Sequence, residues 1–177
     1  MKKYLTLILC IGVIISEPAQ AGMMVWGVGY AMSVPEPDGW VATGDVKQID
    51  TIAMGLYQKG YNWDSSPAVM YAHLMLNQTS LKKAVSQYIS KAQMECPTLK
   101  VEKIDSHTKR FICNEGSSPT YRLVRFININ RMNVLWILSS HSIDSLSASA
   151  PIFEEVSQSA TLERKLVPWN HRTYTVH

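Results

Sequence analysis

The sequence lacks a strong excess of charge of either sign. Its 177 residues include 17 Lys and Arg and 14 Asp and Glu, so the formal net charge is +3 at pH 7. A protein that binds nucleic acid neutralises several phosphates and carries a clustered basic surface for that purpose. The near balance of charge therefore argues against a nucleic-acid partner.

The amino terminus lacks a hydrophobic run long enough to cross a membrane. Its apolar stretch, residues 5–15, is about half of the roughly 20 residues that a membrane-spanning helix needs. It follows two lysines and precedes the segment AQA at 19–21, whose small residues suit signal peptidase. We predict a cleaved signal peptide over 1–21, with the cut between Ala21 and Gly22. This implies a periplasmic or secreted protein with no stable membrane anchor.

Cysteine is scarce, and one of the three cysteines, Cys10, lies in the predicted signal peptide. The mature chain would keep Cys96 and Cys113, and an oxidising compartment favours a disulfide bond between them. Such a bond would stabilise the chain by about 3 kcal/mol. Two separately buried thiols are the alternative. A two-cysteine metal site is disfavoured, because neither cysteine has a His or another Cys at close ligand spacing.

Catalytic and metal-binding motifs are also missing from the sequence. It has no Gly-x-Ser-x-Gly elbow. Residues 139–149 gather serines with His141 and Asp144, but a catalytic triad is defined by spatial geometry, and helix capping explains these residues equally well. Histidines and acidic residues do not cluster as zinc or calcium ligands do. We therefore predict no catalytic residue, no metal site and no cofactor.

Strand-like segments dominate what is present. They are rich in Val, Ile, Tyr and Trp and are bounded by Gly, Pro, Asn and Asp. The segment at 133–140 is nearly continuous in apolar residues, which predicts a central strand covered on both faces. Hairpin loops are predicted at 105–109 and 130–132, with Cys113 opposite about Val101. The predicted strands are 24–33, 51–58, 68–76, 99–104, 110–115, 121–129 and 133–140.

Two helices are predicted among these strands. The first starts after a cap at Thr79 or Ser80 and ends at Pro97, because its apolar residues fall on one stripe of a 3.6-residue period. The second lies in 142–160 and contains Pro151, which is favoured only in the first turn of a helix. We therefore predict a turn over 142–149 and a helix over 150–160. The fold class is α+β, with an antiparallel sheet and helices packed on it.

Four segments together resemble the PsbP-like α/β/α sandwich superfamily. They are GW at 39–40, SSPAVMYAHL at 65–74, YRLVRFININRMNVLWILSS at 121–140 and PIFEEVSQS at 151–159. The group includes an extrinsic photosystem subunit, a yeast nuclear import factor that binds the Ran GTPase and many secreted bacterial proteins. The resemblance implies a scaffold used for binding, mostly to other proteins, without a shared active site. The length of the mature chain predicts one domain, over 22–161, and the tail over 162–177 lies outside the resemblance.

His73 is the first candidate binding residue. Its strand places it on one face with Val69, Tyr71 and Met75. There it could be a ligand or a general base, and the alternative is a partly buried histidine with one hydrogen bond.

The strand at 121–129 supplies four further candidates. Arg122 and Arg125 fall on opposite faces by the two-residue period, so they cannot form one clamp unless a bulge intervenes. Tyr121 shares the face of Arg125, and Asn128 shares the face of Arg122. Aromatic residues beside arginine are typical of protein contacts, although ordinary packing also explains them. The last candidate is Trp169, in the predicted tail.

These features predict an exported, non-enzymatic binding protein of the cell envelope. It would engage a protein or a small ligand through a sheet face or loops. One alternative is a small secreted hydrolase whose residues come together from distant segments, for example around His73. Another is an inhibitor or immunity-type protein that caps an envelope enzyme with exposed Trp, Tyr and Arg side chains.

Overall fold

The chain is described here by a computed structural model that covers residues 22–27, 30–44, 52–75, 80–115 and 118–164. This part of the chain forms two helices and ten strands, which confirms the α+β class. In chain order they are β1 (Gly22–Gly27), β2 (Tyr30–Pro35), β3 (Trp40–Thr43), β4 (Ile52–Gln58), β5 (Ala68–Met75), α1 (Leu81–Glu95), β6 (Lys100–Lys103), β7 (Thr108–Cys113), β8 (Thr120–Ile129), β9 (Met132–Ser140), α2 (Ile143–Ser159) and β10 (Thr161–Arg164).

Seven of the described strands form one antiparallel sheet in the order β3-β4-β5-β9-β8-β7-β6. β9 lies between β5 and β8, and all of its residues except Ser139 are buried. This confirms that the apolar segment forms a central strand covered on both faces. The other three strands form a smaller antiparallel sheet in the order β1-β2-β10.

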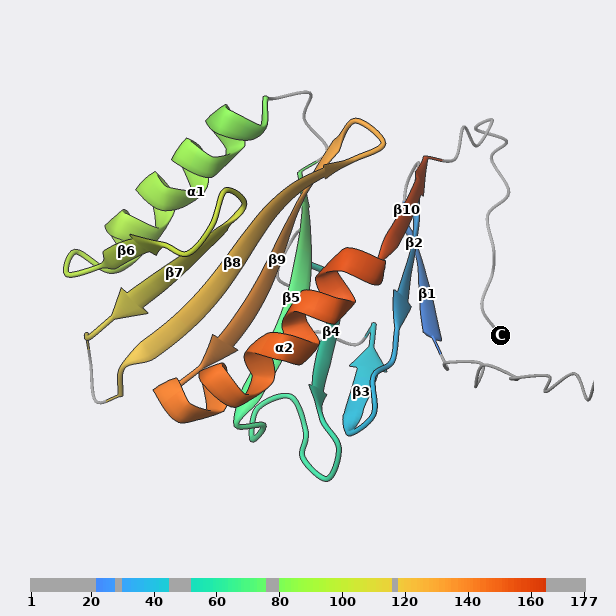
Figure 1. Cartoon of the computed structure of the whole chain (residues 1–177), viewed down its shortest axis with the longest axis horizontal. Coiled ribbons are helices and arrows are strands. Elements are labelled where there is room, and N and C mark those ends of the chain that lie inside the picture. The colour runs from blue at the N-terminus through green and yellow to red at the C-terminus, as the bar shows by residue number, and fades with distance from the viewer. Residues whose placement is uncertain (1–21, 28–29, 45–51, 76–79, 116–117, 165–177) are drawn as a thin grey trace, which may run out of the picture.

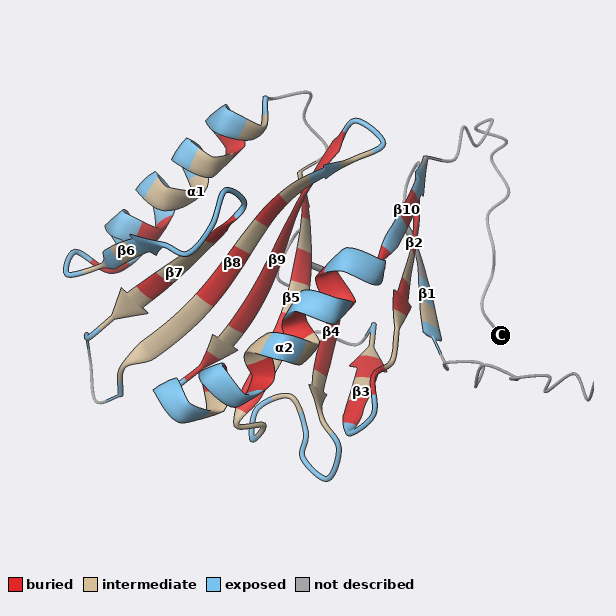
Figure 2. Ribbon diagram, viewed as in Figure 1, coloured by how far each residue is buried: buried red, intermediate tan, exposed pale blue. Residues whose placement is uncertain are grey.

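The two faces of the larger sheet are covered by different helices. α2 packs on β9, β8 and β5 and lies in front of them in Figure 1, with the smaller sheet beside it. α1 packs on the opposite face, over the side chains of β7, β8 and β9 that point away from α2. In Figure 2, buried residues run along β9, and exposed residues line the outer surface of α1. The result is a helix, sheet and helix sandwich. Neither described helix is long and apolar enough to cross a membrane.

The predicted first helix is confirmed as α1. The hydroxyl of Ser80 accepts a hydrogen bond from the backbone N–H of Lys83 and so caps the first turn. Cys96 follows the helix in an extended conformation, directly before Pro97. The apolar stripe faces the sheet, as the sequence period predicted.

The prediction of one strand over 24–33 was wrong. β1 ends at Gly27 and β2 begins at Tyr30, and the two strands pair with each other. The sequence has glycines at 27 and 29, and glycine weakens a strand and favours a reversal of the chain. The short strand β3 was not predicted.

The predicted division of the second helix was also wrong. α2 runs without a break from Ile143 to Ser159, with Pro151 inside it. Proline cannot donate a hydrogen bond to the carbonyl four residues earlier, here that of Ser147. Both Pro151 and Ser147 are exposed, so solvent can satisfy this carbonyl and the helix tolerates the proline.

Part of the predicted tail belongs to the fold. β10 pairs with β2, and Leu162 is only 1% exposed in the core beside α2. The side-chain amide of Asn130, in the β8–β9 turn, donates a hydrogen bond to the carbonyl of Leu162. Asn130 and Arg131 have φ angles of 50° and 65°, as expected for a tight hairpin turn at this place.

The predicted register between β6 and β7 was shifted by two residues. Val101 pairs with Phe111 and not with Cys113. The cause is the carboxylate of Asp105, which accepts hydrogen bonds from the backbone N–H groups of His107 and Thr108. This turn closes the hairpin early, so β7 begins at Thr108.

Candidate functional site

The two candidate arginines of β8 lie on opposite faces of the larger sheet, as the two-residue period indicated. Arg125 points to the side of α2, where it forms an ion pair with Glu154 at 3.6 Å. Arg122 points to the side of α1, where it interacts with Tyr88. They therefore belong to two separate surroundings.

Arg122 is part of a group that we call the α1-side cluster. The group combines residues of β5, α1 and β8 that interact electrostatically with one another. β9 separates β5 from β8, so side chains of these strands that point to one face come close above it. Its members are Tyr71 and His73 of β5, Tyr88, Lys91 and Glu95 of α1, and Arg122 of β8.

Two tyrosines stabilise the charged form of Arg122 beneath α1. Burial lowers the pKa of Arg122, but the nearby Tyr71 and Tyr88 outweigh this effect, and the net result is a raised pKa. Among the described residues, the Nε of Arg122 is buried and has no hydrogen-bond partner. The guanidinium is thus charged, incompletely paired and only partly exposed to solvent.

Both tyrosines of the cluster remain protonated at neutral pH. Burial raises the pKa of Tyr88, and the neighbouring Tyr71 raises it further. Burial also raises the pKa of Tyr71, against the opposing effect of Arg122. The ring of Tyr88 packs edge-on against Phe111 and Phe126, with centroid distances of 5.4 and 5.8 Å. These contacts fix Tyr88 in place beside Arg122.

His73 extends the cluster along β5. The centroid of its ring is 5.5 Å from that of Tyr71, and the centroid of the Trp63 ring is 6.1 Å from that of the same tyrosine. Burial lowers the pKa of His73, and the positive charges of Lys91 and Arg122 lower it further. The neighbours of His73 are therefore aromatic and charged as well as apolar, and the ring is neutral at pH 7.

Trp63 is positioned by the loop that precedes β5. The side-chain carbonyl of Asn62 accepts hydrogen bonds from the backbone N–H groups of Asp64 and Ser65, at 3.0 and 2.9 Å. This local turn presents the indole to Tyr71.

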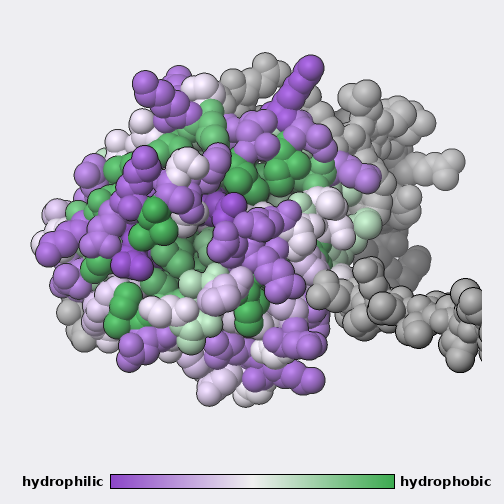
Figure 3. Space-filling model, viewed as in Figure 1, coloured by the Kyte–Doolittle hydropathy of each residue, from purple (hydrophilic) through white to green (hydrophobic). Residues whose placement is uncertain are grey.

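Tyr121 and Arg125 occupy the side of α2. Tyr121 is half-buried and packs against the core there, beside Leu123. The side chain of Arg125 is 17% exposed and that of its partner Glu154 is 62% exposed. Figure 3 shows this side of the molecule, where hydrophobic residues form several patches separated by hydrophilic ones.

The remaining predicted residues lie elsewhere. Asn128 is exposed near the end of β8, and its amide donates a hydrogen bond to the side chain of Asn133 at 2.8 Å. This pair is on the side of α1 but at the hairpin end, away from Arg122 along the strand. Trp169 and Ala21 lie outside the described residues.

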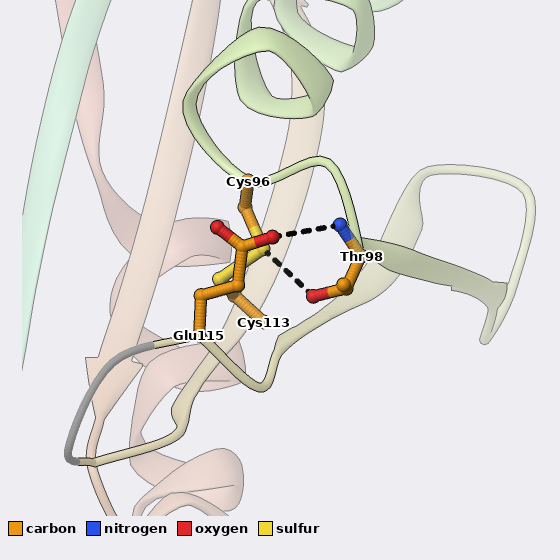
Figure 4. The surroundings of a disulfide bond; sticks show 4 residues. All are labelled: Cys96, Thr98, Cys113 and Glu115. Atoms are coloured by element: carbon orange, nitrogen blue, oxygen red, sulfur yellow. Dashed lines mark hydrogen bonds between the residues drawn. A yellow bond between two sulfur atoms is a disulfide. The ribbon is translucent and has the colours of Figure 1, made fainter.

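Cys96 and Cys113 form a disulfide, with Cα atoms 6.1 Å apart, as predicted (Figure 4). It ties the end of α1 to the end of β7. Glu115 lies beside it and accepts a hydrogen bond from the backbone N–H of Thr98 at 3.0 Å. Among the described residues, these two cysteines and Glu115 make the one group of three with metal-binding side chains. Because the sulfurs are bonded to each other, they are not thiolate ligands.

The sequence interpretation missed most of the α1-side cluster. Tyr71 and Tyr88 were seen only as members of apolar patterns, and Trp63, Lys91 and Glu95 were not singled out as site residues. The period-two pattern did place Tyr71 with His73. No local signal, however, shows that a helix residue will meet an arginine more than thirty positions later, because strand order decides that contact.

No family model matches the chain, and no curated protein sequence matches it. Solved structures do match. LpqN of Mycobacterium tuberculosis, involved in cell envelope biogenesis, is 11% identical, with 82% of this chain and 92% of LpqN covered and a TM-score of 0.50. The Ran-binding protein Mog1p of Saccharomyces cerevisiae is 10% identical, with 80% and 95% covered and a TM-score of 0.48.

Two further structures are similar. Cyanobacterial PsbP (CyanoP) of Synechocystis is 13% identical, with 89% of this chain and 99% of CyanoP covered and a TM-score of 0.44. A protein of Bacteroides thetaiotaomicron is 14% identical over 76% of this chain, with a TM-score of 0.46, and the chain spans only 45% of its length. At such identities the similarity concerns the fold alone. The chain shares the fold of LpqN, and a PsbP protein, the group that the sequence resemblance named, is among the similar structures.

Proposed function

We propose that the chain is an exported, non-enzymatic binding protein of the cell envelope, which engages a protein or a small ligand through a face of its larger sheet. The observation that carries this proposal is Arg122 beneath α1, which forms no ion pair among the described residues. Arg110 and Arg125 also have an Nε without a partner there, but each pairs with a carboxylate. A partly buried charge lowers stability unless it is well paired, and an apolar residue would pack there at a lower cost. A charged group kept at such a place is a candidate for ligand contact.

The aromatic side chains around Arg122 support the same side of the sheet. Tyr71, His73 and Tyr88 are all half-buried, so part of each ring meets solvent. Tyrosine and arginine together are enriched where proteins bind other molecules, because they combine apolar area with hydrogen-bonding groups. Two of the candidate residues from the sequence, His73 and Arg122, lie in this cluster.

Export is supported by two observations. The amino terminus has the three parts of a secretory signal. Disulfides such as Cys96–Cys113 persist in oxidising compartments. The mature chain would then start at Gly22.

Affinity capture tests the binding function. The mature chain from Gly22 serves as bait in an envelope extract, beside Arg122→Gln and, as a matched control, Arg110→Gln. Arg110 pairs with Leu123 across the strands and therefore faces the side of α2. We expect a specific polypeptide or small molecule with the wild type and with Arg110→Gln, and a weaker yield with Arg122→Gln. Turnover of the captured molecule, or no specific recovery with the wild-type bait, would contradict the proposal. Equal recovery with all three baits would place the contact away from Arg122.

Export is tested separately. Protein isolated from envelope and cytosolic fractions of the native host is analysed by mass spectrometry. We expect a polypeptide that begins at Gly22, with Cys96 and Cys113 oxidised, in the envelope or the medium. An intact Met1 in the accumulated protein would contradict export.

A further inference from the structure

The α1-side cluster holds one positive charge in excess. Lys91 and Arg122 are cations, Glu95 is the one carboxylate in the group, and the lowered pKa of His73 keeps that ring neutral. The two tyrosines cannot compensate for the excess, because their raised pKa values keep both hydroxyls protonated. The cluster is therefore suited to a ligand that carries a single negative charge.

The carboxylate within the cluster is not placed to satisfy Arg122. Glu95 lies one helical turn from Lys91 and forms an ion pair with it at 3.9 Å. Their side chains are 56% and 73% exposed, respectively, so this pair is at the surface. Arg122 interacts with Tyr88 and with the more distant charge of Glu95, while its buried Nε has no hydrogen-bond partner among the described residues. The deeper of the two cations is thus the one without an ion pair in this part of the chain.

The shape of the guanidinium further limits the class of anion that would bind. Arginine presents its donors in a planar fork that matches two oxygens of one carboxylate. A doubly charged phosphate would exceed the single excess charge. A monoanionic carboxylate would neutralise the single excess positive charge of the cluster.

Aromatic rings lie next to Arg122 in this cluster. Tyr71 interacts with Arg122, and its ring contacts the rings of Trp63 and His73 edge-on, with centroid distances of 6.1 and 5.5 Å. Tyr88 adds a fourth ring from α1 and interacts with both Tyr71 and Arg122. Such rings favour contact with another flat, apolar ring through edge-on or offset stacking.

We propose that the α1-side cluster binds an aromatic carboxylate, with the carboxylate on Arg122 and Lys91 and the ring against Trp63, Tyr71 and His73. This inference rests on the proposed binding function and names the ligand class and the residues that recognise it. The carboxylate source is a free small acid or an aromatic residue at the carboxyl end of a peptide, since both present the same chemistry.

Titration with benzoate tests the proposal on the mature, oxidised protein, with resonances followed by NMR. Benzamide is the matched neutral probe, and a dipeptide ending in phenylalanine distinguishes the peptide source from the free acid. We expect benzoate to shift resonances of β5 and α1 and to bind at least tenfold more tightly than benzamide. Arg122→Gln should weaken benzoate binding at least tenfold, and Lys91→Gln should weaken it several-fold. Arg110→Gln, on the other side of the sheet, should bind as the wild type does.

Several outcomes would overturn this inference. They are no benzoate binding at millimolar concentration, equal binding of benzoate and benzamide, or shifts confined to the side of α2. If Arg122→Gln does not fold, as judged by its NMR spectrum, the exposed Lys91→Gln variant decides, and unchanged affinity there also overturns the inference. A polypeptide captured from the envelope extract independently of Arg122, together with no benzoate binding, would leave the general binding function standing and remove this site.

Discussion

The two faces of the larger sheet differ in how completely they are closed. On the side of α2, twenty buried side chains of the described residues form one cluster, which α2, the smaller sheet and the larger sheet share. On the side of α1, the corresponding cluster has six buried side chains, and half-buried tyrosines, a histidine and an arginine surround it. One face is therefore built mainly for stability, whereas the other keeps polar groups partly accessible.

The arginines of β8 show the same contrast three residues apart. Arg125 reaches a carboxylate on the helix that covers its face. Arg122 lies beside Tyr88 and forms no ion pair among the described residues, whereas the Nε atoms of both arginines lack a hydrogen-bond partner there. Since a partly buried charge without an ion pair contributes little to stability, the difference suggests a role for Arg122 other than stability.

Replacement of one leucine on each face compares the two sides most directly. Leu138 points to α2 and is 0% exposed, and Leu135 points to α1 and is 1% exposed. Each change to Ala should lower the free energy of unfolding by about 2–5 kcal/mol. We expect Leu138→Ala to cost more, because a cavity in the larger cluster relaxes less. Chemical denaturation measures both variants, and a greater loss for Leu135→Ala would reverse the comparison.

Removal of the disulfide should affect the side of α1 next most strongly. The double change Cys96→Ser and Cys113→Ser opens a loop with a sequence separation of 17, which should cost about 3 kcal/mol of unfolding free energy. Hydrogen exchange should show increased opening in α1 and β7, with little change in α2. The control is reductant, which should destabilise the wild type and leave the double variant unchanged. Uniform opening of both helices would argue that the two faces are not independent.

The pH dependence of stability tests the burial of His73 on the side of α1. Its pKa in the folded chain is lowered from 6.5, mainly by burial. Below pH 6.5 the unfolded chain therefore binds a proton that the folded chain does not. The free energy of unfolding consequently decreases as the pH is lowered from 6.5 to the pKa of His73 in the folded chain. We expect a smaller effect than that of the disulfide, since a single side chain titrates.

The contribution of His73 is measured as the difference between wild type and His73→Gln. Denaturation curves at pH 7.5, 6.5 and 5.5 should show a steeper loss of stability for the wild type. Parallel pH dependence of the two proteins would show that His73 is not held neutral.

The ion pair on the side of α2 should give the smallest effect. A double-mutant cycle with Arg125→Gln and Glu154→Gln should yield a coupling of about 0.5 kcal/mol, because Glu154 is 62% exposed and solvent screens the pair. High salt should reduce this value. A coupling above about 2 kcal/mol would mean that solvent does not screen this ion pair.

Much of the fold could be predicted because its signals are local. The apolar stripe and the cap at Ser80 defined α1, and the continuous apolar run of β9 identified the central strand. Predictions of helix and strand boundaries were wrong where solvent or a side-chain hydrogen bond offset a local sequence preference. Pro151 sits inside α2 because its exposed side lets solvent replace the missing donor, and the Asp105 turn moved the β6–β7 register by two residues.

The candidate site was less predictable than the fold. Alternation along β8 placed Arg122 and Arg125 on opposite faces, and alternation along β5 joined His73 with Tyr71. Which of these residues share surroundings depended on strand order, since β9 inserts between β5 and β8. The sequence gives no measure of that order, so Tyr88 and Lys91 could not be assigned to Arg122 beforehand.

The sequence by itself determined which segments become helices and strands and which side of each strand is apolar, because these properties follow from periods of 3.6 and 2 residues. Only the tertiary structure decided that a tyrosine pair from β5 and α1 encloses the guanidinium of Arg122 while Arg125 meets a carboxylate. The reason is that the electrostatic environment of a side chain is set by neighbours from distant segments, which the packing of the sheet and helices brings together.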